Sequence, residues 1–97
     1  MSITVIIELR IKPDKLKAVR PLFATLLGET RMRDGNEGVT VQQEVDCPTS
    51  IILLEKWQNK NLYETYTHWR AQKGDFERLS ELLERPLNRR FLEHVPV

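Results

Sequence analysis

The chain has 97 residues, and its 15 Lys and Arg against 14 Asp and Glu give a formal net charge of +1. A chain of this length buries only about 60–65% of the surface that its unfolded form exposes, so we expect one domain, residues 1–97, with a modest core. Like charges never run beyond a dipeptide, and a basic pair such as Arg89 and Arg90 is typical of solvated surface. Phosphate recognition needs a concentrated basic face, so nucleic acid is not expected as a partner.

No targeting or membrane segment is recognisable in the sequence. No stretch approaches about 18 consecutive apolar residues, and the N-terminus has no basic segment followed by an apolar run of signal length. The single cysteine, Cys47, has no second cysteine with which to form a disulfide. We therefore expect a cytoplasmic protein that does not act at a membrane.

The first elements are a strand and a helix. Residues Ile3 to Lys12 are rich in β-branched side chains and place apolar residues at every second position, which predicts a strand. Pro13 can begin a helix, and the apolar spacing that follows predicts an amphipathic helix reaching to about Thr30. Pro21 removes a hydrogen bond from this helix, so we expect a bend near Arg20.

A hairpin is predicted next. Residues 31–38 contain two glycines and are typical of a loop, and Val39 to Asp46 alternate as a second strand. The segment Asp46 to Ser50 is predicted as a short turn into a third strand, Ser50 to Gln58, which would make the two strands antiparallel. Either Asn59 or Asn61 is then expected to cap a helix that extends to Trp69.

The last part of the chain predicts another helix and a final strand. Phe76, Leu79, Leu82 and Leu83 share one helical stripe that Pro86 would end, and Leu87 to Val97 read as a short strand. The order βαββαβ predicts an α+β, ferredoxin-like fold with a four-stranded antiparallel sheet and helices on one face only. The other face would carry three apolar side chains among charged ones, which favours a homodimer as its cover: Ile6, Ile52 and Leu54.

One stretch gathers the side chains that could form a site. Residues 51–69 hold both Trp, both Tyr and one of the two His of the chain. Strand alternation places Glu55 on the same face as Trp57, and the turn that follows would bring Trp57 near Tyr63 and Tyr66. Aromatic rings and a carboxylate that converge on an apolar face are typical of a small-molecule pocket.

Each of these side chains also has a structural interpretation. Trp57, Tyr66 and Trp69 are of the kind that pack in a core, and His68 lies beside the apolar stripe, where it could be either a base or a surface residue. A carboxylate such as Glu55 costs free energy on an apolar face unless it is paired or used. A salt bridge from Glu55 to Arg70 is the structural alternative.

The chain resembles a known family. The segment ELRIKP before an amphipathic helix, a glycine-containing loop, a hairpin with Asp and Pro at its turn, and LLEKW before a helix are similar to the antibiotic biosynthesis monooxygenase (ABM) family. The resemblance covers Ile3 to Val95. It implies a dimeric α+β barrel in which two sheets pack face to face, with a substrate cavity between sheet and helices in each subunit.

The resemblance assigns roles to some residues. Trp57 matches the Trp that ends the family's third strand, and Tyr63 matches a Tyr that lines the cavity in the polyketide-oxidising branch. Leu53 stands where that branch has Asn, and Tyr66 stands where the family often has His. Ile7 replaces the Asn that the haem-degrading branch needs, and the His of its late helix is also missing, so haem degradation is not expected.

These observations lead to one main hypothesis. We expect a cofactor-free monooxygenase that uses molecular oxygen on an aromatic, phenolic or quinol-like molecule, because such a substrate can itself reduce oxygen once it is deprotonated in a dry cavity. No metal is expected, because His68 and His94 lie far apart in the sequence. The alternatives are a non-catalytic ligand-binding or stress-related dimer, and an isomerase acting on a small polar metabolite. The expected catalytic residues are Tyr66, His68 and Glu55, and the expected substrate-binding residues are Trp57, Tyr63, Trp69, Leu53, Ile7 and Phe23.

Overall fold

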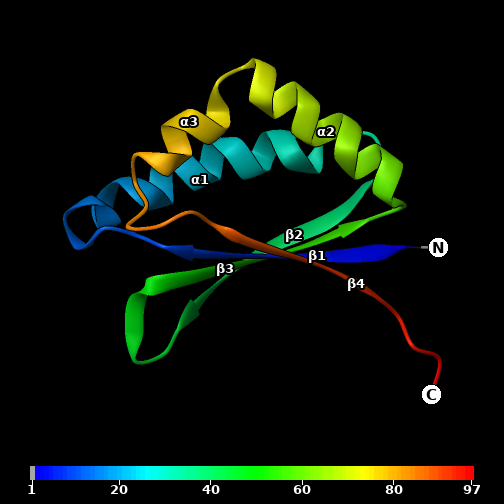
Figure 1. The fold of residues 1–97 in the computed structure, drawn as a ribbon, viewed down its shortest axis with the longest axis horizontal. Coiled ribbons are helices and arrows are strands. Elements are labelled where there is room, and N and C mark those ends of the chain that lie inside the picture. Colours follow the sequence, from blue (N-terminus) through cyan, green and yellow to red (C-terminus); the bar gives the residue numbers. More distant parts are fainter. Residues whose placement is uncertain (1) are drawn as a thin grey trace.

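A computed structural model describes residues 2–97. Four strands form one antiparallel sheet in the order β2 (Asn36–Glu44), β3 (Cys47–Trp57), β1 (Ile3–Arg10) and β4 (Asn88–Glu93), and the helices lie on one face of it (Figure 1). This is the α+β, ferredoxin-like arrangement that the sequence predicts, and the prediction is confirmed. The elements in chain order are β1 (Ile3–Arg10), the 3-10 turn η1 (Pro13–Lys15), α1 (Leu16–Arg31), β2 (Asn36–Glu44), β3 (Cys47–Trp57), α2 (Lys60–Gln72), α3 (Asp75–Ser80) and β4 (Asn88–Glu93).

The core lies between the sheet and the helices. Every second residue of β1 is buried, because strand side chains alternate between the two faces. The opposing side chains come from α1, which continues through Pro21 as one helix and buries Val19, Phe23 and Leu27. In β3 the buried face holds Ile51, Leu53, Glu55 and Trp57, as the alternation predicts.

The hairpin turn is shorter than the sequence predicts. The chain turns at Val45–Asp46, and β3 already begins at Cys47 rather than at Ser50. The ladder shifts between Gln43, which pairs with Ile51, and the next residue, which pairs with Cys47. The irregularity accommodates Pro48, which has no N–H to donate, and the Pro48 carbonyl accepts a 2.8 Å hydrogen bond from Gln43 Nε2.

The second predicted helix of the C-terminal half is wrong in its extent. α3 covers only Asp75–Ser80, and Leu83 forms an isolated antiparallel bridge with Ile11 beyond it. The backbone of this segment binds the end of β1, because Lys12 N donates to Leu82 O and Glu84 N donates to Arg10 O. The C-terminal part of the predicted apolar stripe, Leu82 and Leu83, therefore lies in a turn and a single bridge rather than in a longer helix. The final strand is also shorter, since β4 ends at Glu93 and Val95 lies exposed beyond it.

The sheet face opposite the helices is uncovered in one chain. Ile6 and Ile52 are half-buried there, while Leu54 and Leu92 are 36% and 42% exposed. Glu8 on the same face binds Arg90 of β4 at 2.9 Å and Asn88 at 3.1 Å. In residues 2–97, no helix is long and apolar enough to cross a membrane.

Candidate functional site

The turn from β3 into α2 is built by local hydrogen bonds. Asn59 is the residue that caps α2, and its Oδ1 accepts from Leu62 N at 2.9 Å. One residue earlier, Gln58 N donates to Gly35 O at 2.7 Å, which joins the turn to the start of β2. The geometry brings the Trp57 ring to within 5.5 Å of the Tyr63 ring centroid and 4.9 Å of the Tyr66 ring centroid.

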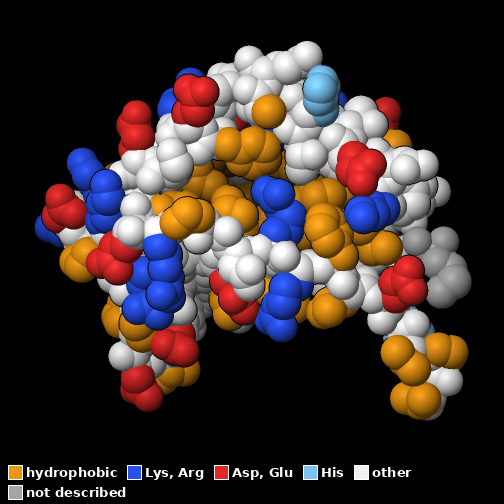
Figure 2. All heavy atoms as spheres, viewed as in Figure 1, with side chains coloured by type: hydrophobic (Ala, Val, Ile, Leu, Met, Phe, Trp, Pro, Cys, Tyr) orange, Lys and Arg blue, Asp and Glu red, His pale blue; other side chains and the backbone are white. Residues whose placement is uncertain are grey.

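A small cavity lies beside these rings, between the sheet and the helices. Its volume is about 50 Å³, well below the roughly 300–1,000 Å³ typical of ligand pockets. The cavity is small because the aromatic side chains of the site fill much of the space between the sheet and the helices. Figure 2 shows hydrophobic side chains gathered between the helices and the sheet around a basic side chain. The lining residues are Ile7, Phe23, Leu26, Leu27, Leu53, Glu55, Tyr63, Tyr66, Arg70, Asp75, Phe76, Leu79, Leu87 and Arg89.

Glu55 is one of the two carboxylates that line this cavity. It is 2% exposed, and its Oε1 accepts a 2.9 Å hydrogen bond from Trp57 Nε1. The salt bridge to Arg70, which was the structural alternative for Glu55, is absent, and among residues 2–97 no cation pairs with Glu55 within 4.0 Å. Burial raises the pKa of Glu55, and the Trp57 hydrogen bond and the positive charges of Arg89 and Arg70 offset only part of this rise.

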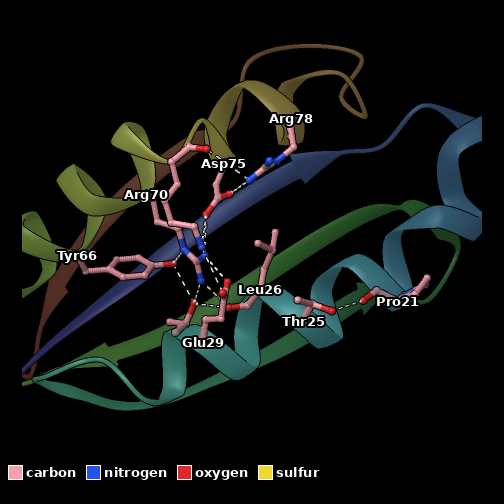
Figure 3. Close-up of polar contacts among 10 residues, drawn as sticks. Pro21, Thr25, Leu26, Glu29, Tyr66, Arg70, Asp75 and Arg78 are labelled. Carbon is pink, nitrogen blue, oxygen red and sulfur yellow. Dashed lines mark hydrogen bonds and ion pairs between the residues drawn. The ribbon is translucent and has the colours of Figure 1, made fainter.

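Arg70 instead holds the helices together (Figure 3). Its Nη1 donates to Glu29 and to Asp75, each at 2.8 Å, and its Nη2 donates to the carbonyl of Leu26 at 2.5 Å. Asp75 also pairs with Arg78. Burial alone would raise the pKa of Asp75, but the hydrogen bonds from Arg70 and Arg78 lower it. A buried charge is tolerated when it is paired and hydrogen-bonded, so this cluster is structural.

The Tyr66 hydroxyl belongs to the same network. It accepts a 3.0 Å hydrogen bond from Arg70 Nε and lies 2.9 Å from Thr30 Oγ1. Thr30 Oγ1 donates its own proton to the Leu26 carbonyl at 3.0 Å, so Tyr66 is the donor in the Tyr66–Thr30 contact. Burial raises the pKa of Tyr66, and that of Tyr63 likewise. The phenol of Tyr66 is thus held neutral with its proton already engaged.

The structure brings together six of the nine expected site residues and leaves three outside the cavity. Trp57 is fully buried behind Glu55, and His68 is exposed on α2. Trp69 is half-buried beside cations, with the guanidinium carbon of Arg33 4.2 Å from its ring centroid. The six that line the cavity are Tyr66, Glu55, Tyr63, Leu53, Ile7 and Phe23.

Several lining residues are not identified by the sequence alone, and Arg89 is the most informative. The sequence predicts it as solvated surface together with Arg90, yet it is half-buried and lines the cavity. Alternation along β4 could have separated the two, because neighbouring strand residues point to opposite faces. For Phe76 and Leu87 the sequence predicts a helix and a strand, respectively, but no place in the cavity. In the part of the chain that the structure describes, no group of three or more His, Cys, Asp or Glu is placed to hold a metal ion.

These features define a class: a small α+β protein with a mostly apolar cavity between its sheet and helices. The model of the antibiotic biosynthesis monooxygenase (ABM) family matches residues 2–77. The chain therefore belongs to the ABM family. No curated protein sequence gives a significant match.

Solved structures agree on the fold. A conserved protein from Methanosarcina mazei Go1 is 25% identical with a TM-score of 0.88, and the match covers 96% of this chain and 92% of that one. An antibiotic biosynthesis monooxygenase is 17% identical with a TM-score of 0.88, over 97% and 99% of the two chains. SnoaB, a cofactor-independent oxygenase from Streptomyces nogalater, is 12% identical with a TM-score of 0.80, over 99% and 95%.

Proposed function

We propose that this protein is a cofactor-independent monooxygenase that oxidises an aromatic, phenolic or quinol-like molecule in the cavity between sheet and helices. The observation that carries the proposal is Glu55, a buried carboxyl in a mostly apolar cavity that accepts one hydrogen bond and pairs with no cation among residues 2–97. Its raised pKa makes its carboxylate a stronger base than an exposed one. Membership of a family that includes cofactor-independent oxygenases supports the same reading.

The proposed reaction needs little from the protein beyond a base and a dry environment. Glu55 removes the proton of a phenolic hydroxyl, and the phenolate gives one electron to molecular oxygen. The two radicals combine at a ring C–H carbon to form a C–O bond, and the resulting peroxide takes back the proton held by Glu55 to give a hydroperoxide. Loss of water breaks the O–O bond and the ring C–H bond and leaves a quinone, so that one oxygen atom enters the product and the other leaves in water. Excluding bulk water strengthens each charge interaction in these steps.

The other lining residues are given supporting roles. Because the Tyr66 proton is engaged by Thr30, we assign Tyr66 and Tyr63 to contact with the substrate ring rather than to proton transfer. A phenol ring does not fit in about 50 Å³, so binding requires the wall to move. Phe76 and Leu87, which are half-buried and belong to the short α3 and to the segment before β4, are the side chains we expect to swing aside.

We further propose that the protein acts as a homodimer. The sheet face opposite the helices exposes Leu54 and Leu92, and proteins of this family typically dimerise. A second copy would cover these side chains, which a monomer would leave in water.

Oxygen consumption by the metal-free protein tests the proposed reaction, with a panel of hydroquinones and polycyclic phenols as substrates. Enzyme-dependent uptake is expected, and Glu55→Gln should lower it by about 100-fold or more, because a general base contributes that much. His68→Ala is the matched control and should leave uptake unchanged, since His68 is exposed and outside the cavity. No uptake above the spontaneous rate for any substrate would overturn the proposal and favour a binding or isomerase role. Full activity of the Glu55 variant would remove Glu55 as the base.

A further inference from the structure

Arg89 is a half-buried cation on β4 that lines the cavity. It pairs with Ile7 of β1, so its side chain lies on the helix face of the sheet, as the Ile7 side chain does. The next residue, Arg90, lies on the opposite face, where it binds Glu8. Arg89 therefore contributes a positive charge to the same cavity that contains the carboxyl of Glu55.

The guanidinium of Arg89 has no polar partner among residues 2–97. It takes part in no side-chain hydrogen bond and no ion pair there, and its Nε is buried without an acceptor. Its contacts are aromatic, with the guanidinium carbon 5.9 Å from the Tyr63 ring centroid and 5.7 Å from that of Phe76. A buried donor without an acceptor costs free energy, so the site lacks a partner that a ligand could supply.

Arg70 does not compete for this role. It lines the same cavity, but its donors are already used by Asp75, Glu29 and neighbouring oxygens. Glu55 does not supply the missing acceptor either, because it lies beyond ion-pair distance of Arg89 and accepts from Trp57. Of the two cations that line the cavity, Arg70 and Arg89, Arg89 is the one whose donors are free for a ligand.

We propose that Arg89 binds a carboxylate of the substrate, so that the substrate is an aromatic acid that carries both a carboxylate and a phenolic hydroxyl. A planar guanidinium matches a carboxylate in a bidentate geometry, and the carboxylate is a compact anion suited to a narrow cavity. The substrate ring then lies against Tyr63, with its hydroxyl toward Glu55. This assignment of substrate class rests on the proposed function for the role of the hydroxyl, whereas the carboxylate contact stands on Arg89 alone.

Equilibrium binding tests the carboxylate contact without relying on catalysis. The probes are 2,5-dihydroxybenzoate and hydroquinone, which share the ring and both hydroxyls and differ by the carboxylate. We expect the acid to bind the wild-type protein about tenfold to a hundredfold more tightly, the range of a charge-assisted hydrogen-bonded pair. In Arg89→Gln this preference should disappear, and in Arg89→Lys part of it should remain. Arg90→Gln, one residue away on the other face, should keep the full preference.

Calorimetry at neutral pH gives the affinities, and circular dichroism checks that each variant is folded. Equal affinity for the two probes, no measurable binding of the acid, or a preference that survives in Arg89→Gln would each overturn the proposal.

Oxygen uptake separates the carboxylate contact from the proposed function. Arg89-dependent binding of the acid without uptake of oxygen would leave the anion subsite standing and remove the oxygenase reaction. Uptake of oxygen with hydroquinone but no preference for the acid would support the oxygenase reaction and overturn the anion subsite.

Discussion

Glu55 and Arg70, two of the buried charged residues that line the cavity, differ in how many hydrogen-bond partners they have. Arg70 donates to two carboxylates, two hydroxyls and a backbone carbonyl. Removing Arg70 would leave Asp75 buried without its main partner. Glu55 has one donor, the indole of Trp57. A structural network is expected to be saturated, whereas a reacting group needs unused capacity. This contrast is why we assign the chemistry to Glu55.

The raised pKa of Glu55 makes a prediction about stability. A carboxyl whose pKa is higher in the folded state favours folding when protonated, so its contribution to the free energy of unfolding falls as pH rises through that window. Glu55→Gln cannot ionise, and its amide oxygen can still accept from Trp57. We therefore expect the variant to be more stable than wild type at neutral pH, with the difference shrinking toward and below the ordinary glutamate pKa of about 4.3.

Urea unfolding of both proteins across this pH range measures the difference. Comparing the two proteins cancels the opposite trend from Asp75 and Glu29, whose pKa values are lowered and whose contributions are lost as pH falls. Wild type gaining stability over the variant as pH rises would show that the Glu55 charge is stabilised in the fold, contrary to its raised pKa.

The sequence identifies the chemistry of single residues better than their partners. Glu55 could be singled out because a carboxylate interrupts an apolar strand face. The partner of Arg70 could not be predicted, because Asp75 and Glu29 come from different helices whose packing is a tertiary property. Arg89 was missed because the extent and register of β4 decide which member of a basic pair faces the core.

At the scale of elements, the start of α2 depends on a close approach by Gly35. Gly35 has a φ of +88°, and a Cβ placed there would lie 2.6 Å from Leu62 Cδ1 and 2.7 Å from Leu62 Cβ. The same residue accepts the hydrogen bond from Gln58 N that ends β3. The turn that places Trp57 against Tyr63 and Tyr66 therefore needs a residue without a side chain at this position.

Gly35→Ala should lower the free energy of unfolding by more than about 1–2 kcal/mol, the cost of a left-handed backbone for a residue with a Cβ, because the clash with Leu62 adds to it. Gly28→Ala is the matched control. Gly28 lies inside α1, and a Cβ added to it would enter open space, so alanine should raise stability by about 0.5–1 kcal/mol. Chemical denaturation of the two variants decides this, and a Gly35 variant as stable as wild type would show that the turn can relax.

Elements with strict alternation or clear punctuation could be predicted, and those decided by competition could not. The alternation of β1 and β3 and the Asn59 cap are local properties, and the structure has them. The apolar spacing of the C-terminal stripe fits a helix as well as the spacing in α1 does, although the structure continues it as a helix only to Ser80. The residues of this stripe are Phe76, Leu79, Leu82 and Leu83. The chain leaves the helix after Ser80 because Leu82 and Glu84 bond to the end of β1, and no local pattern encodes that pairing.

At the scale of the molecule, the two faces of the sheet differ in structure and in expected function. The helix face holds the cavity, while the open face holds Leu54, Leu92 and the half-buried Ile6 and Ile52 among charged side chains such as Lys56. A monomer would expose this apolar patch, and packing against a second sheet would bury it. Since the cavity lies on the other side of the sheet, dimerisation and substrate binding should be separable.

Leu54→Glu tests this separation, because Leu54 lies on a central strand of the open face and would place a charge in the middle of the interface. Wild type should sediment at twice the monomer mass, and the variant should associate more weakly by about 2 kcal/mol or more, the cost of an unpaired charge buried in an interface. Thr65→Glu, exposed on α2, is the control and should remain dimeric. The monomeric variant should keep its oxygen uptake per subunit, whereas loss of uptake on dissociation would show that the second copy completes the site.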